Sequence, residues 1–108
     1  MTLETAKALK EAGWEKETEK YWFKQNEDDW FRVPATPKEA EYVGYKPPFY
    51  PCPSLEELLA ELRDVFLWKT KLCYHAQLNG KPETECISNN PTESVAQLWL
   101  KLRKERIV

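Results

Sequence analysis

The chain has 108 residues, with 16 Lys and Arg against 18 Asp and Glu, and a formal net charge of -2. This length is typical of one compact domain, and we expect a single domain over residues 1–108. The chain lacks the basic excess of proteins that bind DNA or RNA, so we do not expect nucleic acid as a partner. Hydrophobic residues make up 42% of the chain and aromatic residues 13%, which predicts a fold built around a few large rings.

The first 15 residues carry charges at every third or fourth position and lack the apolar core of a signal peptide. No stretch approaches the ~18 apolar residues of a transmembrane helix, so we expect a cytoplasmic protein without a membrane partner. Three cysteines at wide spacing (Cys52, Cys73 and Cys86) and one histidine (His75) match neither a zinc site nor a disulfide framework. We therefore expect no metal and no cofactor.

Residues 3–12 have helical spacing of Leu3, Ala6 and Leu9, with Thr2 as N-cap and Gly13 as C-cap, and predict a short helix. Two aromatic runs within residues 21–33 surround a polar four-residue turn at residues 26–29 and predict a hairpin. This hairpin would have large apolar side chains on both sides. One side would carry Tyr21, Phe23 and Trp30, and the other Trp22, Phe31 and Val33.

Residues 34–53 contain six prolines and predict an extended strap that crosses the domain. Within it, Thr36 to Glu39 has the form of a capping box with proline at the first helical position, which would start one or two helical turns ending at Gly44. The strap also carries Tyr45, Phe49 and Tyr50. These rings could cover the second apolar side of the hairpin, or that side could remain an exposed aromatic patch.

Ser54 and Glu57 form a second capping box before a leucine stripe through Leu62, which predicts an amphipathic helix. The apolar run from Val65 to Leu78, followed by Asn79-Gly80, predicts a second hairpin with a type I′ turn. From Asn90 the sequence predicts a C-terminal helix, with its N-cap, a first-turn proline and an apolar stripe.

A two-residue turn at Asn79-Gly80 would place Leu78 opposite Lys81 and, further along, Cys73 opposite Cys86. These thiols could form a cross-strand disulfide on oxidation, or pack as reduced side chains. One face of the hairpin would meet the helices and carry Phe66, Trp68, Thr70, Leu72, Tyr74, Ala76 and Leu78. The other would carry Lys69, Lys71, Cys73, His75, Thr84 and Ser88.

The resulting fold class is α+β, in the order α-β-β-α-β-β-α, with antiparallel hairpins packed on helices. A single four-stranded sheet with helices on one face fits this order, and so do two hairpins on opposite sides of the helices.

His75 is the one candidate general base, with Glu83 or Glu85 on the adjoining strand to orient it. A lone strand histidine beside Thr84 is more often a solvated surface residue than a base, so we expect no catalytic residue and no enzyme.

The excess of rings favours a non-enzymatic module that binds a protein partner or a second copy of itself through an aromatic patch around the first hairpin, including Trp22, Phe31 or Trp30. The alternative is a protein that binds a small ligand, possibly a nucleotide, in a pocket between sheet and strap. Tyr45, Tyr50 and Trp68 would line this pocket, with Lys69 or Arg32 near the rim. The candidate binding residues for these two functions are Trp22, Trp30, Phe31, Arg32, Tyr45, Tyr50, Trp68 and Lys69.

Three segments, TAKALKEAGW, YPCPSLEELLAELR and NPTESVAQLWLKLRKE, resemble a group of small uncharacterised proteins encoded by phages, prophages and bacteria. In that group a helix ends in a KEAG turn, a second helix begins with YPxPSLxELL, and the last helix follows the pattern TPEEAVAxLWLxL. The resemblance implies a small α+β accessory protein and assigns no catalytic or binding residue.

Overall fold

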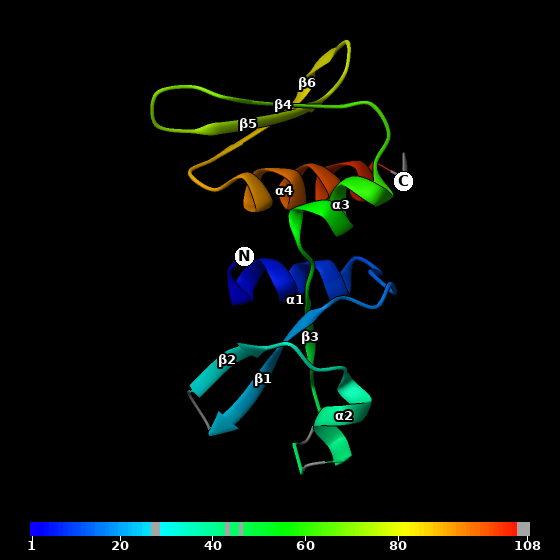
Figure 1. Cartoon of the computed structure of the whole chain (residues 1–108). Coiled ribbons are helices and arrows are strands. Elements are labelled where there is room, and N and C mark those ends of the chain that lie inside the picture. The colour runs from blue at the N-terminus through cyan, green and yellow to red at the C-terminus, as the bar shows by residue number, and fades with distance from the viewer. Residues whose placement is uncertain (27–28, 43, 46, 106–108) are drawn as a thin grey trace. The chain divides into compact units, whose positions relative to one another are not determined.

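The computed structural model describes residues 1–26, 29–42, 44–45 and 47–105, except for the side chains of residues 25, 26, 31 and 33. The chain forms two compact units, the first Thr2–Ser54 and the second beginning at Leu55. Both units combine helices with an antiparallel sheet (Figure 1). The α+β class and the order of the predicted elements are confirmed, but the strands form two three-stranded sheets and not one four-stranded sheet.

The first unit contains a three-stranded sheet in the order β2-β1-β3. Its elements are α1 (Leu3–Glu11), β1 (Lys20–Asn26), β2 (Asp29–Val33), α2 (Pro37–Tyr42) and β3 (Tyr50–Cys52). Strand β3 comes from the strap and pairs with the start of β1, Lys20 opposite Cys52. The proline-rich strap therefore supplies an edge strand that its composition did not predict, because proline is tolerated at a sheet edge.

Both helices of this unit end as their glycines predict. The Trp14 N–H donates to the Leu9 carbonyl oxygen at 2.9 Å, and Gly13 has φ 98°. The same pattern closes α2, where the Tyr45 N–H donates to Ala40 and Gly44 has φ 101°. This is the Schellman motif, which needs a left-handed residue after the helix and so favours glycine.

The predicted helix starts are also confirmed. The Thr2 side chain accepts a hydrogen bond from the Thr5 N–H. Thr36 and Glu39 form the reciprocal capping box, each backbone N–H donating to the other's side chain at 3.2 Å. These bonds satisfy N–H groups that a helix start leaves without partners.

The predicted side-chain faces of the first hairpin are wrong. A four-residue turn would place Gln25 opposite Trp30, but Lys24 is opposite Trp30, with a register shift between Lys24 and Asn26. Trp30 therefore shares a face with Trp22 and not with Phe23. The middle of the predicted turn, residues 27 and 28, lies outside the described residues.

The strap covers one face of this sheet. Of the two predicted alternatives, a covered side or an exposed aromatic patch, this face follows the first. Phe49 packs edge-on against Phe23 with ring centroids 5.1 Å apart, and Tyr45 lies 5.7 Å from the same ring. Phe23 is fully buried and forms a core cluster with Tyr21, Ala40 and Phe49. This cluster is the apolar centre of the first unit.

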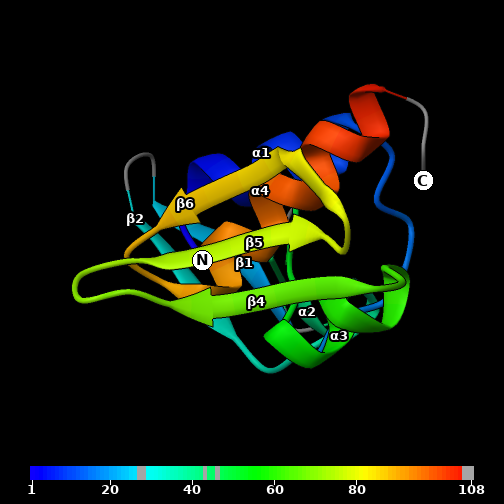
Figure 2. The same cartoon turned by 90° about the horizontal axis from the view of Figure 1, so that it is seen from above.

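The second unit contains a sheet in the order β4-β5-β6. Its elements are α3 (Leu55–Glu61), β4 (Val65–Lys69), β5 (Tyr74–Leu78), β6 (Lys81–Ser88) and α4 (Pro91–Lys104). Helix α4 packs on β5, β6 and α3, so it covers one face of the sheet (Figures 1 and 2). It begins at the predicted N-cap, where the Asn90 side chain accepts from the N–H groups of Thr92 and Glu93.

The run from Val65 to Leu78 is two strands and not one. It reverses at residues 70–73, where the Thr70 N–H donates to the Cys73 carbonyl at 2.9 Å. Trp68 of β4 is paired with His75 of β5, and paired residues on neighbouring strands lie on the same face of the sheet. The even-numbered residues of β4 therefore share a face with the odd-numbered residues of β5. Phe66 and Trp68 are therefore on the face opposite to Ala76, against the prediction that all three meet the helices.

The second hairpin keeps the predicted pair Leu78 and Lys81, and then shifts register. The Thr84 hydroxyl accepts from the Leu78 N–H at 2.9 Å and donates to the Lys81 carbonyl at 2.7 Å. This side chain takes a place that backbone groups would otherwise fill, so β6 contains extra residues before the ladder resumes.

The shift places Cys86 opposite Ala76, so the predicted pairing of Cys73 with Cys86 is wrong, and both are free thiols. The turn also differs from the expected type. Gly80 has φ 77°, but Asp64 is the one non-glycine residue with positive φ in the described chain. A type I′ turn would need positive φ at Asn79 as well.

We predict that Phe23→Ala destabilises the first unit by about 3–5 kcal/mol, because it leaves a cavity in a fully buried ring cluster. Urea denaturation followed by circular dichroism measures this loss. Tyr42→Ala is the matched control, since that side chain is 92% exposed. Equal stability of the two variants would contradict the assignment of Phe23 to the core.

Candidate functional site

The face of the second sheet turned away from α4 carries an exposed apolar and aromatic cluster. We call Phe66, Trp68, His75 and Ile87 the outer-face cluster. The Phe66 and Trp68 ring centroids are 5.5 Å apart, and Trp68 stacks on His75 at 4.9 Å with an interplanar angle of 10°. Ile87 is opposite His75 on the neighbouring strand. Phe66 is 54% exposed and Ile87 56%, although both are large and apolar.

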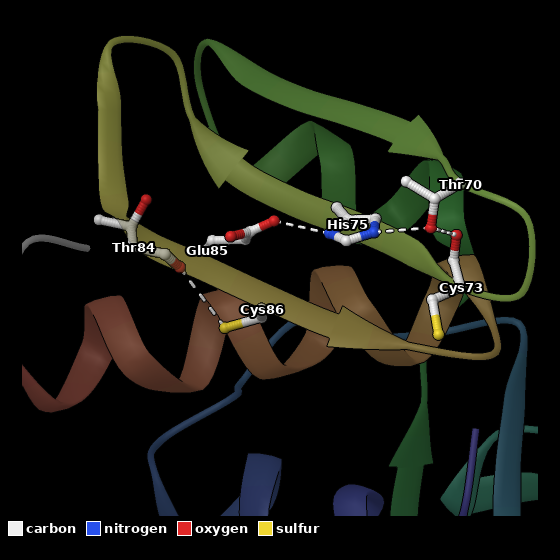
Figure 3. Close-up of polar contacts among 6 residues, drawn as sticks. All are labelled: Thr70, Cys73, His75, Thr84, Glu85 and Cys86. Carbon is white, nitrogen blue, oxygen red and sulfur yellow. Dashed lines mark hydrogen bonds and ion pairs between the residues drawn. The ribbon is translucent and has the colours of Figure 1, made fainter.

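His75 is held by a hydrogen bond at each ring nitrogen (Figure 3). Its Nδ1 is 2.6 Å from Glu85 Oε1, and its Nε2 is 2.9 Å from Thr70 Oγ1. A carboxylate can only accept, so Nδ1 carries a proton toward Glu85. In the neutral ring, Nε2 then presents its lone pair to the Thr70 hydroxyl, which donates.

This arrangement joins a hydroxyl, an imidazole and a carboxylate in the order that hydrolases use for nucleophile, base and orienting acid. Sequence reasoning named His75 and Glu85 and missed Thr70. It placed Thr70 and His75 on opposite faces of one continuous strand. The turn at residues 70–73 instead folds Thr70 back beside His75, and no signal in the sequence marks that turn with glycine or proline.

Cys73 lies in the turn between β4 and β5, whereas Cys86 lies in β6 (Figure 3). Burial raises the pKa of the Cys86 thiol above its ordinary value, nearby Lys101 opposes this rise, and Glu85 adds to it. The Cys86 Sγ donates to the Thr84 carbonyl oxygen at 3.5 Å. At neutral pH Cys86 is therefore a packed thiol and not a thiolate nucleophile.

The rings of the first hairpin lie close to cationic side chains. The Lys7 ammonium is 5.4 Å from the Trp30 ring centroid, and the Lys10 ammonium is 5.3 Å from the Tyr50 centroid. Trp30 and Tyr50 also pack against each other, with centroids 5.4 Å apart. Helix α1 thus partly covers the face of the sheet opposite to Phe23, and the Trp30 and Tyr50 rings on that face are only partly exposed.

The eight predicted binding residues are divided between the two compact units. Arg32 stacks over Trp22 at 5.4 Å, and the Trp22 Nε1 is a buried donor without a described partner. Tyr45 is partly buried and packs against the core cluster, and the side chain of Phe31 lies outside the described part of the structure. In the second unit, Trp68 belongs to the outer-face cluster, while Lys69 points to the other face and lies over the Tyr74 ring.

The first unit has a pocket of about 220 Å³, smaller than the roughly 300 Å³ at which small-molecule sites begin. Its lining includes Trp14, Tyr21 and Phe49, with Lys10 and Glu15 at the polar side. Neither Tyr45 nor Tyr50, which we expected to line a pocket beside the strap, contributes to it. The pocket does not favour the small-ligand alternative.

Within the described residues, no group of three His, Cys, Asp or Glu side chains could hold a metal ion. No helix in that part of the chain is long and apolar enough to cross a membrane. No protein-family model, curated protein or solved structure matches the chain.

We predict that alkylation of Cys86 by iodoacetamide reaches half its maximal rate at a pH above that of an ordinary cysteine, because burial disfavours the thiolate. Lys101→Met should raise that pH further by removing the cation that favours the thiolate. Mass spectrometry of the Cys86 peptide across a pH series measures both rates. A midpoint at or below that of an unstructured cysteine peptide would contradict this account.

Proposed function

We propose that the chain is a cytoplasmic, non-enzymatic protein-interaction module and that the outer-face cluster is its contact surface. The observation that carries the proposal is the exposure of Phe66 and Ile87 on the same sheet face as two stacked rings. The resemblance to small accessory proteins of phages and bacteria is compatible with this function and remains a prediction.

The energetics of exposure support the proposal. Burial of a large apolar side chain contributes about 1.5–3 kcal/mol, and Phe66 and Ile87 forgo more than half of it in the free chain. A partner that covers both recovers this free energy. Aromatic residues are enriched at the centres of protein interfaces because they bury a large area with few rotatable bonds.

The rigidity of the cluster also suits a binding surface. Trp68 is stacked on His75, which is itself fixed by Glu85 and Thr70, so these rings keep one orientation without a partner. A surface that is already ordered loses little side-chain entropy on association. The polar groups of Thr70 and Glu85 beside the rings provide the hydrophilic rim that such interfaces have.

The second sheet replaces the first hairpin as the proposed contact surface. The rings of Trp22, Trp30 and Tyr50 each lie within 6 Å of a cation from the same unit, and none of them is among the highly exposed apolar side chains. A partner would have to displace those cations before reaching the rings. Phe66 and Ile87 need no such rearrangement.

Site-specific photocrosslinking tests the proposal in the producing cells. We expect p-benzoylphenylalanine at position 66 to crosslink one defined protein, identified by mass spectrometry. The matched control carries the same group at position 42, where the native tyrosine is also exposed, and should give no such product. A crosslink to a second copy would assign the surface to self-association, and identical crosslinks from both positions would overturn the proposal.

With the identified partner purified, Phe66→Ser combined with Ile87→Ser should weaken binding by about 2 kcal/mol or more, which is roughly 30-fold in Kd. Isothermal titration calorimetry measures this change. Tyr42→Ser should leave Kd unchanged. Equal affinity of the double variant and the unaltered chain would place the contact elsewhere.

A further inference from the structure

We propose that Thr70 is an activated nucleophile whose Oγ1 accepts an acyl group from a carboxylic ester with a good leaving group. The inference rests on the contacts of Thr70, His75 and Glu85, which lie on the proposed contact surface, and it requires no protein partner. It assigns to the outer face a modification site that composition and spacing did not predict.

Proton acceptance by His75 is the first requirement, and the geometry meets it. Glu85 holds the proton on Nδ1 at 2.6 Å, so the neutral ring has its lone pair on Nε2. That atom is 2.9 Å from Thr70 Oγ1, which is hydrogen-bonding distance for the transfer of the hydroxyl proton. The carboxylate then stabilises the imidazolium that forms.

The position of the imidazole is fixed by a third contact. Trp68 stacks on its face at 4.9 Å, nearly parallel, so the ring cannot rotate away from Thr70 without losing that contact. The side chain of His75 is only 14% exposed, whereas Thr70 is an exposed residue of the turn. The base is therefore shielded and the nucleophile is accessible, which is the distribution that attack on an external ester requires.

One other group competes for the Thr70 hydroxyl proton. The Cys73 carbonyl oxygen is 3.4 Å from Oγ1, much longer than the 2.7–2.8 Å typical of a hydroxyl donating to oxygen. His75 Nε2 is closer and is the better acceptor. The hydroxyl is therefore directed at the base and not held by the backbone.

The step balances without any oxidant or metal. Thr70 Oγ1 attacks the acyl carbon while its proton moves to His75 Nε2. The bond from the acyl carbon to the leaving oxygen breaks, and the imidazolium returns the proton to the departing alkoxide or phenolate. The products are Thr70 acylated at Oγ1, the free alcohol or phenol, and neutral His75. Phe66 and Trp68, beside the imidazole, offer an apolar surface to the acyl chain or to an aryl leaving group.

The test uses p-nitrophenyl acetate with the full chain, and peptide mass spectrometry to locate each acetyl group over time. Thr36 is an internal control, because its hydroxyl is hydrogen-bonded to Glu39 and not to a histidine. A general base contributes roughly 10²–10⁴-fold, so we expect Thr70 to acylate at least about 100-fold faster than Thr36. Equal rates at the two threonines would overturn the proposal.

Three variants distinguish activation of the Thr70 hydroxyl by His75 from simple exposure of that hydroxyl. Thr70→Val should abolish acetylation of the peptide that contains residue 70, because valine has no hydroxyl. Thr70→Ser keeps a hydroxyl and should retain the acetylation. His75→Phe keeps an aromatic ring to stack on Trp68 but removes the base, so Thr70 should then react no faster than Thr36. Unchanged Thr70 acylation in His75→Phe would overturn the proposal, and circular dichroism of that variant checks that the sheet is retained.

Glu85 is a positioning residue, because it touches His75 and not the ester. Glu85→Ala should slow Thr70 acylation and also remove the low-field proton NMR signal that a short Nδ1–H hydrogen bond to a carboxylate produces. A slower reaction with that signal intact would show that Glu85 does not act through the imidazole and would overturn this part of the inference.

Discussion

The short reversal at residues 70–73 determines the chemistry of the second unit. One backbone hydrogen bond, from the Thr70 N–H to the Cys73 carbonyl, accompanies a pairing in which Trp68 is opposite His75. A loop one residue longer or shorter would shift the register of β4 against β5 by one residue. Each side chain of β4 would then lie on the other face of the sheet. Phe66 and Trp68 would then turn toward the helices, and the base would lose the ring that stacks on it. Both the apolar surface and the Thr70, His75 and Glu85 contacts therefore depend on this register.

The two sheets deal with excess aromatic area in different ways. In the first unit, the proline-rich strap covers Phe23 on one face, and lysines of α1 lie over Trp30 and Tyr50 on the other. In the second, α4 covers one face, and the other keeps Phe66 and Ile87 in water. The strap is what makes the difference, because the second unit has no comparable segment among its described residues.

Local signals in the sequence predicted local structure well. The caps at Thr2, Thr36 and Asn90 and the glycines that end α1 and α2 each act within four or five residues, so the pattern alone determines them. Register was not predictable in this way. The Thr84 hydroxyl accepts from the Leu78 N–H at the point where the register shifts, and after this shift Cys86 is opposite Ala76 and not Cys73. The site was half predicted for the same reason: His75 and Glu85 are on neighbouring strands in either register, but Thr70 joins them only if the chain reverses just before Cys73.

Strand β4 is at the edge of its sheet, with β5 on one side and no described strand on the other. Such an edge, carrying Val, Phe, Leu and Trp in succession, is a template for intermolecular strand addition and aggregation. Charged residues bracket it at both ends, Asp64 in a left-handed conformation before it and Lys69 as its last residue. In parallel addition the like charges of two copies would meet and oppose pairing, whereas antiparallel addition would bring Asp64 of one strand toward Lys69 of the other. The charges at the two ends of β4 therefore bias intermolecular strand addition at this edge toward the antiparallel arrangement.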